Sequence, residues 1–385
     1  MAINNTGKSL AGKPLSTMTI GCMRWAGPEN VGDIIQECVN HGALYLDTSP
    51  MYCYNSETEN SETWVGRGIK GIRDKVILSA KCSPGNGGMG IDEWDPLRGF
   101  SNQTSDQVRS TIDQSLTRLG VDYFDCYQMW TVSNELVYES AFKKGGWLEG
   151  VMKAKDEGLF KHLGITGHPE SPMIKRWADE GIFEIMTVPF HIMNTSRLEG
   201  IEYALAKGII VNAMNPLNAG MLGNNTELEI PGLDKIGLSL ENATELALKF
   251  VEAFGMTALC GVSTLEQAKS DIKYLSKPKW TREQALQVSD LFNNLFSGFE
   301  NACTQCGYCK PCPVELDFPE MFKMKNFYKI LKMDSAKQQL ITMSKWYGDG
   351  YKLERCEKCG ICETRCPNGL NVMEQIDETL EIIRG

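Results

Sequence analysis

The chain has 385 residues, of which 42% are hydrophobic and 23% are charged. These fractions are ordinary for a globular protein and exclude wholesale disorder and collagen-like repeats. The 39 basic and 49 acidic residues leave a formal net charge of −10, which argues against general nucleic-acid binding. No run of 18 apolar residues and no apolar signal-peptide core occur, so neither membrane insertion nor secretion is expected.

The fourteen cysteines are the unusual part of the composition. Eight of them lie between Cys303 and Cys366, and the other six are scattered over the first 260 residues. A secreted disulfide framework normally belongs to a short chain with a signal peptide. We therefore expect a cytoplasmic protein whose clustered cysteines bind metal.

Residues 17 to 275 alternate short apolar runs with longer amphipathic segments. The expected strands are 17–21, 43–47, 75–81, 124–130, 161–166, 183–190, 208–214 and 256–261. The expected helices are 31–40, 61–69, 105–120, 134–156, 171–179, 197–206, 239–253 and 264–274. Continuous apolar runs are typical of parallel strands buried on both faces. Eight such units predict an α/β fold, a (β/α)8 TIM barrel with its site at the carboxyl ends of the strands.

A doubly wound open sheet is the alternative fold. Such a sheet usually has a glycine-rich phosphate loop after its first strand. The segment GCMRWAGPEN at 21–30 does not match that pattern, which favours the barrel. Two long loops, 82–103 and 215–239, follow the third and seventh expected strands. Because a barrel binds its substrate at these strand ends, the loops are expected to cover or line the site.

The C-terminal cysteines form two groups with nearly the same spacing. The first group is Cys303, Cys306, Cys309 and Cys312, and the second is Cys356, Cys359, Cys362 and Cys366. A C-x2-C-x2-C run holds three corners of a 4Fe–4S cluster, and the fourth cysteine, before proline, belongs to the other cluster in two-cluster ferredoxins. Zinc normally uses cysteine pairs, and disulfides do not suit the expected compartment.

This pattern predicts two 4Fe–4S clusters with crossed ligands. One cluster takes Cys303, Cys306, Cys309 and Cys366, and the other takes Cys312, Cys356, Cys359 and Cys362. The segments 321–333 and 334–348 between the groups are helical in pattern. The chain is thus expected to divide into a barrel at 1–296 and a small, mostly helical ferredoxin-like domain at 297–385. Exposed clusters are sensitive to oxygen, so an anaerobic source is expected.

Several barrel segments resemble the aldo/keto reductase family. They are LDTSPMY (46–52), ILSAK (77–81), SLTRLGVDYFDCYQMW (115–130), GITGH (164–168), NPLNAGML (215–222) and GVSTLEQAKSDI (261–272). The cysteine module that follows resembles a subgroup of this family with a C-terminal ferredoxin-like domain. The resemblance extends over nearly the whole chain and implies an oxidoreductase.

The resemblance places three catalytic residues at strand ends, namely Asp47, Tyr52 and Lys81. Reducing a carbonyl requires a hydride on carbon and a proton on oxygen. A tyrosine with a pKa near 10 is a reluctant acid–base group, and a nearby ammonium lowers that pKa. Tyr52 is therefore expected to be the proton donor, Lys81 to tune it, and Asp47 to keep Lys81 charged and oriented.

The sequence departs from the family at the end of the fourth strand. The family has a catalytic histidine there, and this chain has Trp130, which carries one hydrogen-bond donor and does not titrate. Trp130 and His168 are the expected substrate-pocket residues, with Trp130 able to form a flat wall for a ring-shaped substrate. The resemblance also implies a nicotinamide site, whose expected residues are Thr166, Thr187, Asn215, Gly261, Ser263, Gln267 and Asp271.

Three functions follow from these features. The first is reduction of a small carbonyl compound, or oxidation of an alcohol, with NAD(P). The second is a nicotinamide-independent reductase in which the clusters deliver single electrons to a substrate in the barrel, supplied by a ferredoxin or flavoprotein partner. The third is a non-catalytic electron-transfer subunit. Cys22, Cys53, Cys82 and Cys260, which follow four neighbouring strands, could bind a further metal, although free cysteines are commonly just small buried residues.

Overall fold

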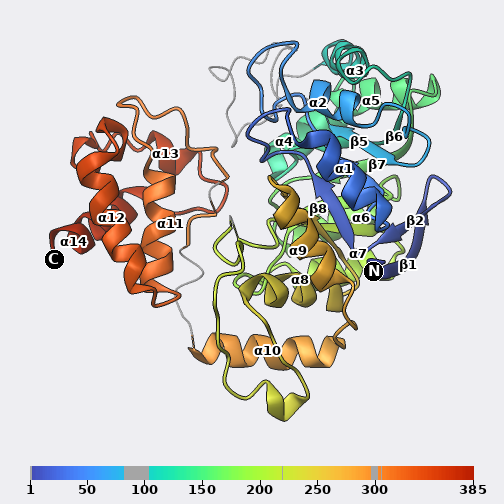
Figure 1. Ribbon diagram of the computed structural model, residues 1–385. Helices are drawn as coiled ribbons and strands as arrows, with labels where there is room; N and C mark the ends of the chain where they lie inside the picture. Colours follow the sequence, from blue (N-terminus) through green and yellow to red (C-terminus); the bar gives the residue numbers. More distant parts are fainter. Residues whose placement is uncertain (1, 82–103, 219, 296–301, 305) are drawn as a thin grey trace.

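The computed structural model describes residues 2–81, 104–218, 220–295, 302–304 and 306–385 (Figure 1). Within these residues, eight parallel strands close into a barrel in the order β10-β3-β4-β5-β6-β7-β8-β9. The strands are β3 (Met18–Gly21), β4 (Tyr45–Asp47), β5 (Ile77–Lys81), β6 (Phe124–Trp130), β7 (Phe160–Thr166), β8 (Ile185–Pro189), β9 (Ile210–Met214) and β10 (Thr257–Cys260). The predicted barrel is confirmed.

Helices pack around the barrel in alternation with the strands. They are α1 (Val31–Asn40), α2 (Ser61–Gly68), α3 (Ser105–Leu119), α4 (Glu135–Phe142), α5 (Trp147–Asp156), α6 (Ser171–Asp179), α7 (Leu198–Ala206), α8 (Ala243–Ala253) and α9 (Leu265–Leu275). The single helix predicted over 134–156 is wrong, because the chain breaks into α4 and α5. Gly145 has φ +75°, and a Cβ at Gly146 would lie 2.6 Å from the carbonyl oxygens of Ser140 and Ala141.

The N-terminus forms a hairpin that the sequence analysis did not predict, of β1 (Asn5–Leu10) and β2 (Lys13–Ser16). Leu10 and Leu15 are buried in a small apolar cluster with the first residues of several strands, including Tyr45 and Ile77. The hairpin therefore closes the amino end of the barrel. Substrate access is left to the carboxyl end, where the βα loops emerge.

The C-terminal part is helical, with α11 (Phe318–Lys329), α12 (Asp334–Trp346), α13 (Ile361–Thr364) and α14 (Val372–Arg384). It follows the long helix α10 (Arg282–Leu295), which covers the barrel, and Figure 1 shows α11, α12 and α14 packed together beside the barrel. These helices bury a second apolar core around Met321 and Leu340. The predicted boundary at 297 and the loop at 82–103 lie outside the described residues. In the described chain, no helix has the length and apolar character needed to cross a membrane.

Candidate active site and cluster-binding domain

Asp47 and Lys81 end two adjacent strands, β4 and β5, at the carboxyl end of the barrel. Both side chains are buried, and the Lys81 ammonium donates to the Asp47 carboxylate. It also donates to the carbonyl oxygen of Thr48 at 3.2 Å. The Lys81 nitrogen lies 5.2 Å from the centre of the Tyr52 ring. The three predicted catalytic residues thus lie together, although their roles stay a prediction.

Inside the barrel, a network of hydrogen-bonded polar side chains holds the Asp47 carboxylate in place. The sequence did not predict this network. Gln128 on β6 donates to the second Asp47 oxygen at 2.8 Å and to Ser79 at 3.0 Å. Its own oxygen accepts from the Thr187 hydroxyl at 2.6 Å. Asn212 continues the chain by donating to Thr187 at 3.3 Å. Because all these side chains are buried and hydrogen-bonded, the Asp47 carboxylate is held in position beside the Lys81 ammonium.

The loop that carries Tyr52 is anchored at the start of α2. Asn60 caps this helix by accepting from the Thr63 amide, and the Thr63 hydroxyl accepts from the Asn60 amide in return. The Ser61 amide donates to the Tyr52 carbonyl at 2.9 Å. These bonds satisfy the open end of the helix and fix the course of the chain from Tyr52 onward.

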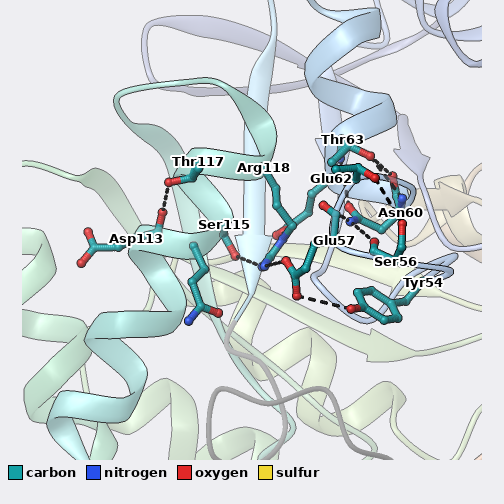
Figure 2. Close-up of polar contacts among 12 residues, drawn as sticks. Tyr54, Ser56, Glu57, Asn60, Glu62, Thr63, Asp113, Ser115, Thr117 and Arg118 are labelled. Carbon is teal, nitrogen blue, oxygen red and sulfur yellow. Dashed lines mark hydrogen bonds and ion pairs between the residues drawn. The ribbon is translucent and has the colours of Figure 1, made fainter.

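Arg118 on α3 ties the same loop to the neighbouring helix (Figure 2). Its guanidinium donates to Glu62 at 2.6 Å and to Glu57 at 3.2 Å. Burial raises the pKa of Glu62, and the Arg118 charge opposes that rise. Glu57 also accepts from the Tyr54 hydroxyl at 3.3 Å, so Tyr54 is held at the exposed rim, while Tyr52 faces Lys81.

The expected tuning of Tyr52 by Lys81 stays a prediction. Burial raises the pKa of Tyr52 well above its usual value, and the Asp47 charge adds to this increase. The Arg24 charge opposes it. Tyr52 is therefore a protonated phenol at neutral pH, which is the form that donates a proton in a reduction.

Trp130 and His168 both lie at the carboxyl ends of their strands. The Trp130 ring meets the Tyr52 ring edge-on, with 6.0 Å between centroids. The backbone amide of His168 donates to Ser133 at 2.8 Å, and burial lowers the pKa of its imidazole to about 3, with help from the Arg197 charge. His168 is therefore neutral at physiological pH. A fourth ring, that of Tyr308, packs against His168 at 5.6 Å.

The seven predicted nicotinamide-site residues fall into two groups in the structure, five at the carboxyl end of the barrel and two in its interior or under a helix. Thr166 is buried at the end of β7. Asn215, Gly261 and Ser263 lie on loops after β9 and β10, Gln267 lies in the first turn of α9, and all four are at least partly exposed. Gln267 accepts from the Ser263 amide at 2.8 Å and donates to Asn224 at 2.9 Å. These loop residues fit a bound cofactor at the rim of the barrel.

The other two of the seven residues, Thr187 and Asp271, are buried and have partners inside the protein. Thr187 is 1% exposed and points into the barrel, where its hydroxyl bonds Gln128. Asp271 is 4% exposed on α9 and pairs with the Cys260 thiol. Burial raises the pKa of Asp271 to about 7. The expected contact of Thr187 and Asp271 with a cofactor stays a prediction.

Arg24 is a basic residue at this rim that the sequence analysis overlooked. It follows β3, and its side chain would lie 3.4 Å from a Cβ added to Gly261. The Ser263 hydroxyl donates to the Arg24 carbonyl at 2.7 Å. The closed barrel brings β3 next to β10, so Arg24 lies beside Gly261 although the two are far apart in sequence. An exposed guanidinium suits a phosphate group.

Each of the two expected ligand sets surrounds its own cavity. The inner cavity, with about 350 Å3 of empty space, is lined by Cys303, Cys306, Cys309 and Cys366. The outer cavity, with about 430 Å3, is lined by Cys312, Cys356, Cys359 and Cys362, together with Cys309. Thiols facing a cavity of this kind fit a 4Fe–4S cluster. The cysteine-by-cysteine ligand assignment stays a prediction.

The described cysteines of the barrel have protein partners. Cys22 and Cys260 are buried, and the Cys53 thiol donates to the carbonyl of Trp25 at 3.3 Å. Across the described ranges, no three histidine, cysteine or acidic side chains gather closely enough to hold a single metal ion. Cys82 lies outside the described residues. Cys22, Cys53 and Cys260 thus fit the expectation of small residues in buried positions.

A closed parallel barrel with an ordered ammonium–carboxylate pair beside a tyrosine, followed by two cysteine-lined cavities, defines an iron–sulfur oxidoreductase. Comparison with known families agrees. Residues 17–291 match the aldo/keto reductase family, and residues 302–371 match the 4Fe-4S dicluster domain. The chain belongs to the aldo/keto reductase family, carries a C-terminal 4Fe–4S dicluster domain, and is an oxidoreductase enzyme.

Individual relatives are distant. L-galactose dehydrogenase of Arabidopsis thaliana is 26% identical over 66% of this chain and 75% of its own length. NADH-specific methylglyoxal reductase of Escherichia coli is 26% identical over 59% of this chain and 73% of its own length. Among solved structures, the holo form of an aldo-keto reductase from Bacillus halodurans has a TM-score of 0.60 at 22% identity, covering 75% of this chain and 96% of that one.

A second solved structure is similar in fold. It is an aldo/keto reductase from Klebsiella pneumoniae in complex with NADP and acetate, with a TM-score of 0.54 at 20% identity. The likeness covers 72% of this chain and 92% of that one. At this level of identity, both structural likenesses establish the barrel fold alone.

Proposed function

We propose that the enzyme reduces the carbonyl group of a small molecule at the carboxyl end of the barrel, with Tyr52 as the proton donor. The observation that carries this proposal is the buried Lys81–Asp47 pair beside the ring of a protonated Tyr52. The ion pair holds the Lys81 ammonium beside the Tyr52 ring, and the protonated phenol is the form of tyrosine that can donate a proton.

A nicotinamide cofactor is the proposed hydride source. Two relatives support it, since one is named NADH-specific and a structural neighbour was solved with NADP. When bound, the cofactor would supply a hydride to the carbonyl carbon. Asn215, Gly261, Ser263 and Gln267 would hold it at the rim, and Arg24 would face its phosphates. The Tyr52 proton goes to the carbonyl oxygen, and solvent restores it afterwards.

The experiment is turnover of an aldehyde and ketone panel with NADH and NADPH by the anaerobically purified holoprotein. Tyr52→Phe removes the donated proton and is expected to lower turnover at saturating substrate at least about tenfold. Tyr54→Phe is the matched control, because Tyr54 lies two residues away at the exposed rim. Equal turnover for Tyr52→Phe, Tyr54→Phe and the unchanged protein would remove Tyr52 from the mechanism.

A second candidate function is favoured by the position of Tyr308. This residue stands between Cys306 and Cys309 of the inner cavity and packs against His168 in the barrel. The cluster domain thus reaches the barrel opening, as a nicotinamide-independent reductase would require. In that case electrons arrive one at a time from a ferredoxin or flavoprotein partner, and Tyr52 still supplies the proton. Cys359, which lines the outer cavity, is exposed, so this cavity is the one that such a partner would approach from solvent.

Stopped-flow absorbance distinguishes the two candidates. If NAD(P)H binds and is oxidised in step with carbonyl reduction, the first function holds. If NAD(P)H has no effect, and reduced ferredoxin or dithionite supports turnover with bleaching of the cluster absorbance, the second holds. Arg24→Gln provides a further check, because it is expected to raise the KM for NAD(P)H severalfold and to leave reduced ferredoxin unaffected.

A further inference from the structure

A buried lysine lies beside the inner cavity of the cluster-binding domain. Lys325 is on α11, its side chain is 4% exposed, and its ammonium lies 5.5 Å from the centre of the Phe322 ring. Phe322 lines the inner cavity. The next residue, Asn326, hydrogen-bonds the backbone of Cys303, which is one of the cysteines of that cavity. The Lys325 ammonium is thus next to a residue of the cavity wall.

Two residues of α14 hold the Lys325 ammonium in this position. It donates to Gln375, a neutral amide, and to Glu378 at 2.9 Å. Glu378 is 35% exposed and also pairs with the exposed Lys329 at 3.6 Å. Solvent screens the charges of Glu378 and Lys329 more than the charge of the buried Lys325. The two lysines and one glutamate therefore leave a net positive charge, whose least screened member lies beside the inner cavity.

The surroundings of Lys325 favour its charged form despite its burial. Burial lowers the pKa of Lys325, and the hydrogen-bonded Glu378 carboxylate opposes this decrease. The nearby Cys303 thiol opposes it as well. Cluster-bound thiolates would add negative charge on the same side, which favours the ammonium further.

A charge near an iron–sulfur cluster helps to set the reduction potential of that cluster. Reduction adds one electron, and so one negative charge, to the cluster. Apolar side chains of the inner cavity, such as Phe318, Phe322 and Leu370, make this added charge unfavourable. A fixed positive charge offsets that cost, and its effect is largest where water is excluded.

The outer cavity has a different kind of lysine. Lys358 lines this cavity, but it is exposed and pairs with the exposed Asp377 at 3.0 Å, so solvent screens its charge. Cys309 lines both cavities, so clusters bound in them would be neighbours. Any difference in their potentials then decides on which of the two an electron stays.

We propose that Lys325 is a potential-setting residue, which raises the midpoint potential of the inner cluster relative to that of the outer cluster. A reduced donor loses one electron at the exposed outer side of the domain, and the inner cluster gains that electron. The reduced cluster is then the one whose cysteines flank Tyr308, which packs against the barrel. This inference rests on the 4Fe–4S domain, and it does not depend on which of the two functions proposed above is correct.

The test is potentiometric titration of the anaerobically purified holoprotein with dithionite, followed by EPR of the reduced clusters. Lys325→Met removes the charge and is expected to move the midpoint potential of the inner cluster to a more negative value. Glu378→Gln removes the opposing charge and is expected to move the same potential in the positive direction, by a smaller amount. Lys329→Met is the matched control, because it removes an exposed lysine bound to the same carboxylate, and both potentials should stay nearly unchanged.

The inner signal is identified in Cys356→Ala, which lacks a cysteine of the outer cavity. A purely structural role of Lys325 would not give shifts of opposite sign in Lys325→Met and Glu378→Gln, nor confine them to one cluster. Wild-type potentials in Lys325→Met at unchanged iron content would overturn the proposal. If Lys325→Met loses its iron, Glu378→Gln decides, and the absence of a positive shift refutes the proposal. Because neither a carbonyl compound nor NAD(P)H is used, the result is independent of the proposed function.

Discussion

Individual side chains were predictable where their position along a strand decides their role. Asp47 and Lys81 end adjacent strands, so a parallel barrel brings them together whatever surrounds them. Thr187 also lies in a strand, but it faces the barrel interior, and its hydroxyl bonds Gln128 where a cofactor contact was expected. The contact of Tyr308 with His168 could not be predicted, because only the docking of a separate domain brings the two rings together.

Buried histidines make the stability of the protein depend on pH. His191, after β8, is 3% exposed, and its Nδ1 has no hydrogen-bond partner among the described residues. Burial, with the Arg197 charge, lowers its pKa to about 3. His191 in the unfolded chain therefore takes up a proton near pH 6.5, whereas His191 in the native protein does so only near pH 3. The neutral His191 makes its full contribution to the free energy of unfolding above about pH 6.5. That contribution falls as the pH drops toward 3, by up to about 1.4 kcal/mol per pH unit.

The measurement is urea unfolding of the holoprotein, followed by circular dichroism under anaerobic conditions between pH 7.5 and 5. His191→Leu has no titrating group and is expected to lose less stability than the unchanged protein on acidification. The control His41→Gln replaces a partly exposed histidine and should keep the wild-type slope. Parallel slopes for wild type and His191→Leu would contradict the assignment.

At the scale of helices and strands, the hydrophobic pattern predicted where the elements lie but not where a helix is interrupted. The apolar runs predicted each barrel strand, since a strand buried on both faces must be apolar throughout. The break between α4 and α5 depends on the positive φ of Gly145 and on carbonyl groups crowding Gly146, which a hydrophobic pattern does not reveal. The β1–β2 hairpin was missed for another reason. Its alternating, half-exposed pattern becomes meaningful only against the barrel end that it covers.

Close approach of helices provides an element-scale prediction. A Cβ added to Gly150 on α5 would lie 2.2 Å from the carbonyl oxygen of Ser105, at the start of α3. Gly150→Ala must push these helices apart and is expected to lower the free energy of unfolding by about 1–3 kcal/mol. Gly32→Ala on α1 is the control, because a Cβ there meets nothing within 4 Å. That change should be neutral or stabilise by about 0.5–1 kcal/mol.

Urea midpoints of the two alanine variants test this prediction. The two changes add the same methyl group to a helix, so any difference in their effect comes from packing. Similar stability for Gly150→Ala and Gly32→Ala would show that α3 and α5 can separate at no cost.

At the scale of the whole molecule, cysteine spacing was sufficient to predict a domain for two 4Fe–4S clusters, while the crossed assignment of individual cysteines stays a prediction. The arrangement of the two domains was not predictable, because it depends on packing between Ile330, Phe327 and the barrel core. Those residues are apolar like many others in the sequence. Their common surface exists only after both domains have folded.

Iron content and selective cysteine changes test the cluster sites. The protein is expected to contain about eight irons and eight acid-labile sulfides per chain. Cys356→Ala should remove the outer cluster, and Cys366→Ala should remove the inner cluster that lies next to Tyr308. Carbonyl reduction with NAD(P)H is expected to suffer more from Cys366→Ala. Zinc in place of iron, or the same residual EPR signal in both variants, would contradict the assignment.

The inner cavity also has a consequence for the order of protein synthesis. Its lining combines Cys303, Cys306 and Cys309 with Cys366, and Asn368 donates to Thr304 at 2.8 Å across the same junction. A ribosome releases the whole barrel and the first three thiols more than fifty residues before the fourth. A nascent or prematurely terminated chain that stops before Cys366 therefore cannot complete the inner cavity. A cluster bound there by all four cysteines is thus confined to chains that have been translated past this residue.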